Sequence, residues 1–134
     1  MKRLKVYYIP FLLIMLLSTG ANAQEKAIID NISNTLNIGS SKELARYFNE
    51  VVELKIDGEK ENYSMRQAEA KMKNFFEKYP PTGFVKIHNG SSPEGLLYVL
   101  GKYSHKKGSH RVYMLIKQLN NGTYKVDTFD LTKE

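Results

Sequence analysis

The spacing of apolar residues near the start of the chain predicts two helices in succession, over residues 25–38 and then from Ser40 onwards. In the first segment apolar residues stand four positions apart, so they share one side of an amphipathic helix. The second segment opens with a capping box, in which a serine and a later glutamate satisfy the first backbone amides of a helix. The residues that carry these signals are Ile28, Ile32, Leu36, Ser40 and Glu43.

The next segment changes to a strand-like pattern. Residues 51–57 alternate apolar and polar side chains, which predicts a strand with one wet face, and residues 58–62 indicate a polar turn. Ser64 and Gln67 then form another capping box and open a long helix, which ends at Tyr79 because two prolines follow. This helix carries the largest aromatic stripe of the chain.

The rest of the chain predicts an antiparallel meander. Its four strands are expected at 84–88, 96–105, 110–119 and 124–131. We expect His105 to face His110 across the turn at residues 106–109. Tyr103 then opposes Val112, on an apolar face that packs against the helices.

The register of the last strand stays open. The turn at Asn121–Gly122 fits either a two-residue turn or a three-residue loop with a glycine bulge. The first places Phe129 and Leu131 on the helix-packed face, and the second places Tyr124 and Val126 there. We prefer the first because its apolar side chains are larger.

Three short stretches support a family resemblance. They are Asn74-Phe75-Phe76, Pro80-Pro81-Thr82-Gly83-Phe84 and Arg111-Val112-Tyr113. With the element order α-α-β-α-β-β-β-β, they resemble the nuclear-transport-factor-2-like (cystatin-like) superfamily of cone-shaped α+β domains. More narrowly, the chain is similar to a domain-of-unknown-function family of secreted bacterial proteins. The resemblance implies helices packed on a curved antiparallel sheet. It implies no activity, because the superfamily contains isomerases, dehydratases and non-catalytic modules.

The first residues have the pattern of an export signal. Lys2 and Arg3 precede an apolar run that is too short to span a bilayer, and Ala21-Asn22-Ala23 fits a cleavage site. We therefore expect residues 1–23 to be a cleaved signal peptide and residues 24–134 to be a single domain. The protein would be exported, periplasmic or extracellular in a bacterium. The chain has no cysteine, so we expect neither disulfides nor a lipid anchor on cysteine.

The charge balance argues against a nucleic-acid partner. The net charge of +6 falls to +3 without the leader, which carries three of the 20 basic residues and none of the 14 acidic ones. Nucleic-acid binders usually show a larger and more clustered excess.

Few residues suggest catalysis. His105 and His110 are close enough to suggest a metal, but a third ligand has no fixed place and lysines lie beside them, so we expect no metal. Asp127 is a weak catalytic candidate, since the preferred register turns it inward, and His105 is another. Nucleotide-binding and nucleophile motifs are absent from the sequence, and we expect no cofactor.

Aromatic and sulfur-containing side chains are the candidates for lining a pocket inside the cone. They are Phe76, Tyr79, Tyr103, Met114 and Phe129. The alternative is that they form the packed core, which a domain of this size without disulfides needs for stability. The hydroxyl groups of Tyr79 and Tyr103 would then require hydrogen-bond partners.

These observations favour an exported, non-catalytic module that binds a small ligand or a protein of unknown identity. The alternative is a small cofactor-independent enzyme of the isomerase or dehydratase type, with an inward-facing carboxylate or histidine. A homodimer through the exposed face of the sheet is a further expectation. Its patch would consist of Tyr98, Leu100, Tyr113 and Leu115.

Overall fold

A computed structural model describes residues 23–134 of the chain. The chain divides into two compact units, Met1–Asp30 and Asn31–Glu134, and the fold described below is that of the second unit. The expected signal peptide lies outside the described residues, apart from its last residue, Ala23. No helix within residues 23–134 is long and apolar enough to cross a membrane.

The elements follow the expected order, with one additional strand. A helix spans residues 23–38. It is followed by α2 (Ser41–Ala45), β1 (Phe48–Ile56), β2 (Glu59–Ser64), α3 (Met65–Lys78), β3 (Pro81–Ser91), β4 (Leu97–His105), β5 (Gly108–Gln118) and β6 (Tyr124–Lys133). Both predicted capping boxes begin helices: the side chains of Ser40 and Ser64 accept from the amides of Glu43 and Gln67.

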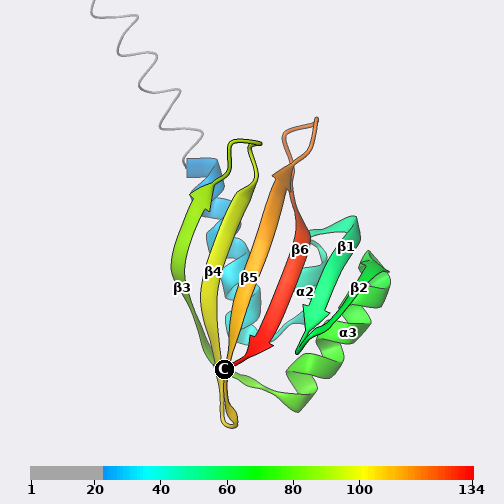
Figure 1. Ribbon diagram of the computed structural model, residues 1–134, viewed down its shortest axis with the longest axis vertical. Helices are drawn as coiled ribbons and strands as arrows, with labels where there is room; N and C mark the ends of the chain where they lie inside the picture. The colour runs from blue at the N-terminus through cyan, green and yellow to red at the C-terminus, as the bar shows by residue number, and fades with distance from the viewer. Residues whose placement is uncertain (1–22) are drawn as a thin grey trace, which may run out of the picture. The chain divides into compact units, whose positions relative to one another are not determined.

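The strands form one curved sheet in the order β2-β1-β6-β5-β4-β3, with α3 beside the β1–β2 end (Figure 1). The predicted meander of β3, β4, β5 and β6 is confirmed, since neighbours in sequence pair antiparallel. The sheet is not antiparallel throughout, because β1 pairs with β6 in parallel. The result is an α+β domain with a mixed sheet.

The additional strand corrects the prediction of a turn over residues 58–62. β1 and β2 are joined by Asp57-Gly58, whose φ angles of 49° and 93° suit a two-residue hairpin turn. All residues of β2 are exposed except Tyr63, which is half-buried. An edge strand with so little buried surface carries no alternation of apolar and polar residues, so its pattern did not indicate a strand.

The β4–β5 hairpin is tighter than expected. His105 pairs with Gly108, whose φ of 132° allows the short turn, and does not face His110 directly. Tyr103, expected opposite Val112, lies opposite His110. The predicted register is therefore wrong by two residues. A shift of two leaves the same side chains on the inner face, because side chains alternate with a period of two.

A bulge decides the register of β6. Asp127 is the extra residue of this bulge, opposite Leu115 and Ile116 of β5. The bulge reverses the alternation of faces, so the apolar residues on both sides of it point inward. The buried residues of β6 are Val126, Phe129 and Leu131. The preferred placement of Phe129 and Leu131 is thus confirmed, and Val126 joins them.

The core lies between the helices and the inner face of the sheet. Ile32, Phe76 and Met114, expected there from the pattern, are 0%, 6% and 1% exposed. Tyr103 is fully buried beside α3, and its hydroxyl donates to the carbonyl oxygen of Tyr79 at 2.5 Å. This bond satisfies a carbonyl at the C-terminal end of α3. Burial raises the pKa of Tyr103, so its hydroxyl keeps the proton that it donates.

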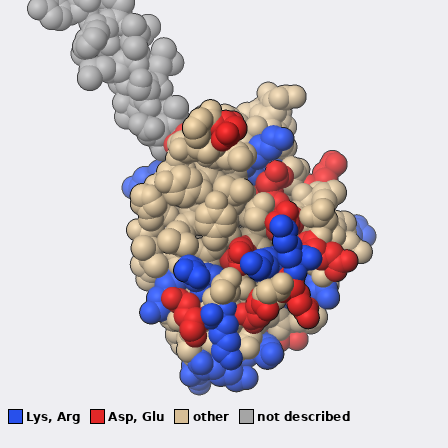
Figure 2. All heavy atoms as spheres, in the orientation of Figure 1, with Lys and Arg blue, Asp and Glu red and all other residues tan. Residues whose placement is uncertain are grey.

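The outer face of the sheet exposes apolar side chains. Val85 and Ile87 of β3 are more than half exposed. Figure 2 shows the outer face, with a broad uncharged area over β3, β4 and β5 and charged side chains towards its lower end. The residues expected to form a dimer patch, Tyr98, Leu100, Tyr113 and Leu115, pair on this face and are partly exposed. The homodimer itself stays a prediction.

Gly101 of β4 should tolerate no side chain. A Cβ at this position would overlap with the ring of Phe84 and lie 2.9 Å from the carbonyl oxygen of Val85. We expect Gly101→Ala to lower the free energy of unfolding by about 1–3 kcal/mol, the usual cost of overpacking, as measured by urea denaturation. Gly83→Ala is the matched control, because nothing lies within 4 Å of its Cβ. Equal losses for both variants would contradict the packing described.

The Tyr103 hydroxyl should stabilise the end of α3. We expect Tyr103→Phe to lower the free energy of unfolding by about 1–3 kcal/mol, because it leaves the buried carbonyl of Tyr79 without its donor. Tyr98→Phe is the control on the same strand, since its hydroxyl hydrogen-bonds to the exposed His88 and not to a buried carbonyl. We expect its effect to stay within about 0.5 kcal/mol. If Tyr103→Phe left the free energy of unfolding unchanged, the prediction would be contradicted, and water would have replaced the bond.

Candidate functional site

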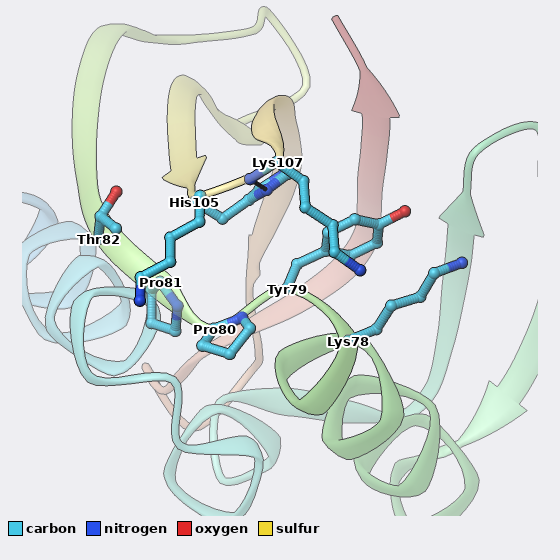
Figure 3. Close-up of a pocket in the computed structure, with 8 residues that line it drawn as sticks. Lys78, Tyr79, Pro80, Pro81, Thr82, His105 and Lys107 are labelled. Carbon is cyan, nitrogen blue, oxygen red and sulfur yellow. Dashed lines mark hydrogen bonds between the residues drawn. The ribbon is translucent and has the colours of Figure 1, made fainter.

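A pocket of about 230 Å³ lies where α3 ends, β3 begins and the β4–β5 turn closes. We call it the Tyr79 pocket. Its lining residues are Lys78, Tyr79, Pro80, Pro81, Thr82, His105, Lys106 and Lys107. In Figure 3, Pro80 and Pro81 lie on the opposite side of the hollow from His105 and Lys107. The pocket therefore combines an apolar wall with a cationic one.

Two lysines approach the same aromatic ring at this pocket. The Nζ of Lys78, from α3, lies 5.3 Å from the centre of the Tyr79 ring, and that of Lys107, from the β4–β5 turn, lies 5.6 Å from it. Cation–π attraction holds ammonium groups at such distances. Neither lysine forms an ion pair with any carboxylate of residues 23–134. The pocket thus has positive charge that the described part of the chain does not neutralise.

A hydrogen-bonded histidine pair lies at the inner end of the pocket, where His105 lines it and His110 lies behind. His105 Nε2 and His110 Nδ1 are 3.0 Å apart. His110 Nε2 lies 3.1 Å from the Asp57 carboxylate, and the backbone N–H of Lys107 donates to His105 Nδ1 at 3.2 Å. Asp57 also accepts from the backbone N–H of Lys133 at 2.9 Å. One chain of polar contacts therefore joins the β1–β2 turn, β5 and the β4–β5 turn.

Aromatic rings cover both imidazoles. The ring of Tyr79 lies 4.5 Å from that of His105 and 4.9 Å from that of His110, measured between centres. Phe75 meets His110 edge-on at 4.9 Å. His110 is 0% exposed and His105 is 6% exposed. No buried side-chain nitrogen or oxygen of the described residues lacks a hydrogen-bond partner. This network satisfies both histidines at the end of the core.

The surroundings of His105 favour its neutral form. Burial lowers the pKa of His105, and the positive charges of His110, Lys133 and Lys107 lower it further, while the Asp57 carboxylate raises it. A neutral imidazole has one nitrogen that donates and one that accepts. Because Lys107 N–H donates to Nδ1, the proton of His105 is on Nε2.

The residues singled out from the sequence divide into three groups. Tyr79 and His105 line the pocket, as described. Asp127 does not join them: it is half-buried at the β6 bulge and accepts from the side-chain amide of Asn49 at 3.0 Å. The other candidates for pocket lining are packed into the core with at most 6% exposure. They are Phe76, Tyr103, Met114 and Phe129.

The histidine pair does not have the arrangement of a metal site. Its facing nitrogens share a hydrogen bond and so do not converge on a common point. Within the described residues, no group of three or more His, Asp or Glu side chains has a geometry suited to a metal ion. His88 contacts Tyr98 on the exposed part of β3 and β4, apart from the pair.

Sequence reasoning missed two members of the site. Asp57 had a usable signal, because Asp-Gly after an alternating run is typical of a hairpin turn. That turn reaches His110 only because β1 crosses to pair beside β6. Lys78 had no signal, since its place beside the Tyr79 ring depends on how α3 ends.

The histidine pair should make stability depend on pH. The pKa of His105 is lower in the folded than in the unfolded chain, so the unfolded chain binds protons more readily. The stability that neutral His105 contributes is therefore present above about pH 6.5 and is lost as the pH falls through the folded pKa. Urea denaturation between pH 7.5 and pH 5 should show a steeper loss for the wild type than for His105→Gln. Parallel profiles would contradict this assignment.

The comparisons with known proteins agree with the architecture. The family described as "Domain of unknown function (DUF4783)" matches residues 29–131. A DUF4783 family protein from Bacteroides ovatus is 28% identical, with 78% of this chain and 93% of that chain covered and a TM-score of 0.73. No curated protein matches the chain.

Two more distant solved structures show the same fold. The protein named Rd1NTF2_05 is 13% identical, with 83% of this chain and 98% of that chain covered and a TM-score of 0.65. A domain of unknown function with a cystatin-like fold from Nostoc punctiforme is 12% identical, with 87% of this chain and 78% of that chain covered and a TM-score of 0.65. From the sheet order, the match over residues 29–131 and these structures, the chain belongs to the DUF4783 family and has the NTF2-like, cystatin-like fold.

Proposed function

We propose that this chain is an exported, non-catalytic module that binds a small anionic ligand in the Tyr79 pocket. The observation that carries the proposal is the pair of lysines beside one aromatic ring. Lys78 and Lys107 come from different elements, both lie within 6 Å of the Tyr79 ring centre, and no carboxylate of residues 23–134 pairs with them. Lys106 adds a third positive charge to the lining.

The size and chemistry of the pocket define the class of ligand. Its volume of about 230 Å³ lies below the roughly 300–1,000 Å³ of sites for drug-sized molecules, so the ligand is small. The lysines suit a carboxylate or an oxyanion, and the two prolines with Tyr79 suit a short apolar body. A short-chain carboxylate combines both properties.

The state of the polar groups supports binding over catalysis. A general base needs a free lone pair within reach of the substrate proton. In His105 and His110 each ring nitrogen already has a partner, and the lone pair of His105 Nδ1 accepts from Lys107 N–H. Asp127 is engaged with Asn49 and lines no part of the pocket. No observation favours the alternative of an isomerase or dehydratase.

Charge reversal at the pocket should weaken anion binding. The test is an NMR titration of the protein, residues 24–134, with butyrate and with its neutral amide, butyramide. We expect butyrate to shift the amide signals of Tyr79, His105 and Lys107, and butyramide to bind more weakly. Lys78→Glu and Lys107→Glu should each lower the affinity for butyrate several-fold, because an exposed ion pair contributes roughly 0.2–1 kcal/mol and reversal turns attraction into repulsion.

Lys73→Glu provides the matched control. Lys73 is exposed on the same helix as Lys78 but does not line the pocket, and the substitution changes the net charge by the same amount. It should leave the affinity unchanged. If butyramide bound as well as butyrate, or if all three variants lost affinity equally, the anion site would be refuted.

A further inference from the structure

The polar contacts around the histidine pair determine where each proton sits. Lys107 N–H can only donate, so His105 Nδ1 accepts and His105 Nε2 carries the hydrogen. His105 Nε2–H then donates to His110 Nδ1, which leaves His110 Nε2–H to donate to the Asp57 carboxylate. Every bond in this chain has one donor and one acceptor. The arrangement therefore runs in a single direction, from the pocket to Asp57.

Only one ring nitrogen of the histidine pair can accept a further proton. The pair has four ring nitrogens: two share one hydrogen at the His105–His110 contact, and His110 Nε2 holds the hydrogen that faces Asp57. Only His105 Nδ1 still has a lone pair that no ring hydrogen occupies. A further proton on the pair therefore resides at His105 Nδ1, whichever imidazole formally carries the charge. This nitrogen belongs to a histidine that lines the pocket, and it accepts from Lys107 N–H.

That protonation cannot leave the turn unchanged. Once His105 Nδ1 carries a hydrogen, it faces Lys107 N–H as a second donor, and the bond between them is lost. The two atoms are 3.2 Å apart, so the two N–H groups then point at each other and the turn must move to separate them. An anionic oxygen that moves between them accepts from both. Such charge-assisted bonds are stronger than neutral ones.

On balance the charged and titratable groups around His105 oppose its protonation while the pocket is empty, because burial and the positive charges of His110, Lys133 and Lys107 outweigh the Asp57 carboxylate. These groups come from six places in the fold. They are Lys78 and Tyr79 at the end of α3, Tyr103 on β4, Lys106 and Lys107 in the β4–β5 turn, His110 on β5, Lys133 on β6 and Asp57 in the β1–β2 turn. Only Asp57 among them is an acid that favours the charged form. An anion in the pocket adds negative charge on the side of the lysines, so proton uptake and anion binding favour each other.

We propose that His105 is a pH-dependent ligand-binding residue of the Tyr79 pocket: in acid, Nδ1 takes a proton from solvent, releases Lys107 N–H, and both groups donate to the bound anion. This inference rests on the proposed function of the pocket, and it names the residue that regulates it. At neutral pH the lysines alone attract the anion. At acidic pH His105 and the freed backbone amide add two directed donors, which favours an oxyanion over a neutral ligand.

The test is a titration with sulfate, whose charge is constant over the range used, at pH 7.5 and at pH 5.5. The protein is residues 24–134, and binding is followed by NMR. We expect the wild type to bind sulfate at least about tenfold more tightly at pH 5.5, the effect of one added charge-assisted hydrogen bond. In His105→Asn the affinities at the two pH values should differ much less. His88→Asn is the matched control and should keep the wild-type response, since His88 contacts Tyr98 and lines no part of the pocket.

A measurement without ligand tests the switch separately. Nitrogen chemical shifts should show His105 protonated on Nε2 alone at pH 7.5 and on both nitrogens at acidic pH, where the amide of Lys107 loses its protection from hydrogen exchange. If Lys107 kept its protection while His105 gained a proton, the inference would be overturned. Tight sulfate binding with no pH response would overturn this inference and leave the proposed function standing. An absence of sulfate and butyrate binding at both pH values would overturn both.

Discussion

The polar groups buried where α3 meets the sheet are the constraint on which this fold depends. Tyr103, His105 and His110 lie at the end of an apolar core, and an unpaired polar atom there would cost about 1–3 kcal/mol. The Tyr103 hydroxyl donates to the carbonyl oxygen of Tyr79 at the end of α3. The two imidazoles bond to each other, His105 accepts from Lys107 N–H, and His110 contacts the Asp57 carboxylate. These bonds determine how α3 ends and how both hairpin turns meet it.

The Tyr79 pocket is a consequence of this closure. Because Tyr79 covers both imidazoles, its ring ends the core, and the chain turns away through two prolines into β3. The short β4–β5 turn places Lys107 on the same ring that Lys78 of α3 approaches. The pocket is thus built on the end of a helix and a tight hairpin, with its lysines at the surface and the histidine pair behind them.

Much of the architecture could be predicted because it depends on local patterns. The capping boxes at Ser40 and Ser64 and the alternation along β4 and β5 identify their elements without knowledge of the fold. The register of β4 against β5 was wrong by two residues because the length of a turn depends on the backbone angle of one glycine, Gly108. The strand β2 was missed because an edge strand buries almost nothing and has no apolar pattern.

The sequence alone determined the class of the domain, many residues of its core, the closeness of the two histidines and the two tyrosines whose hydroxyl groups would need partners. These properties follow from side-chain polarity and spacing, which act over a few residues. Only the tertiary structure decided that Asp57, distant in sequence, faces His110, that Asp127 sits in a bulge beside Asn49, and that Lys78 and Lys107 share one ring. Such contacts depend on the parallel crossover between β1 and β6 and on the angle of α3, which result from the packing of the whole core and not from any one segment.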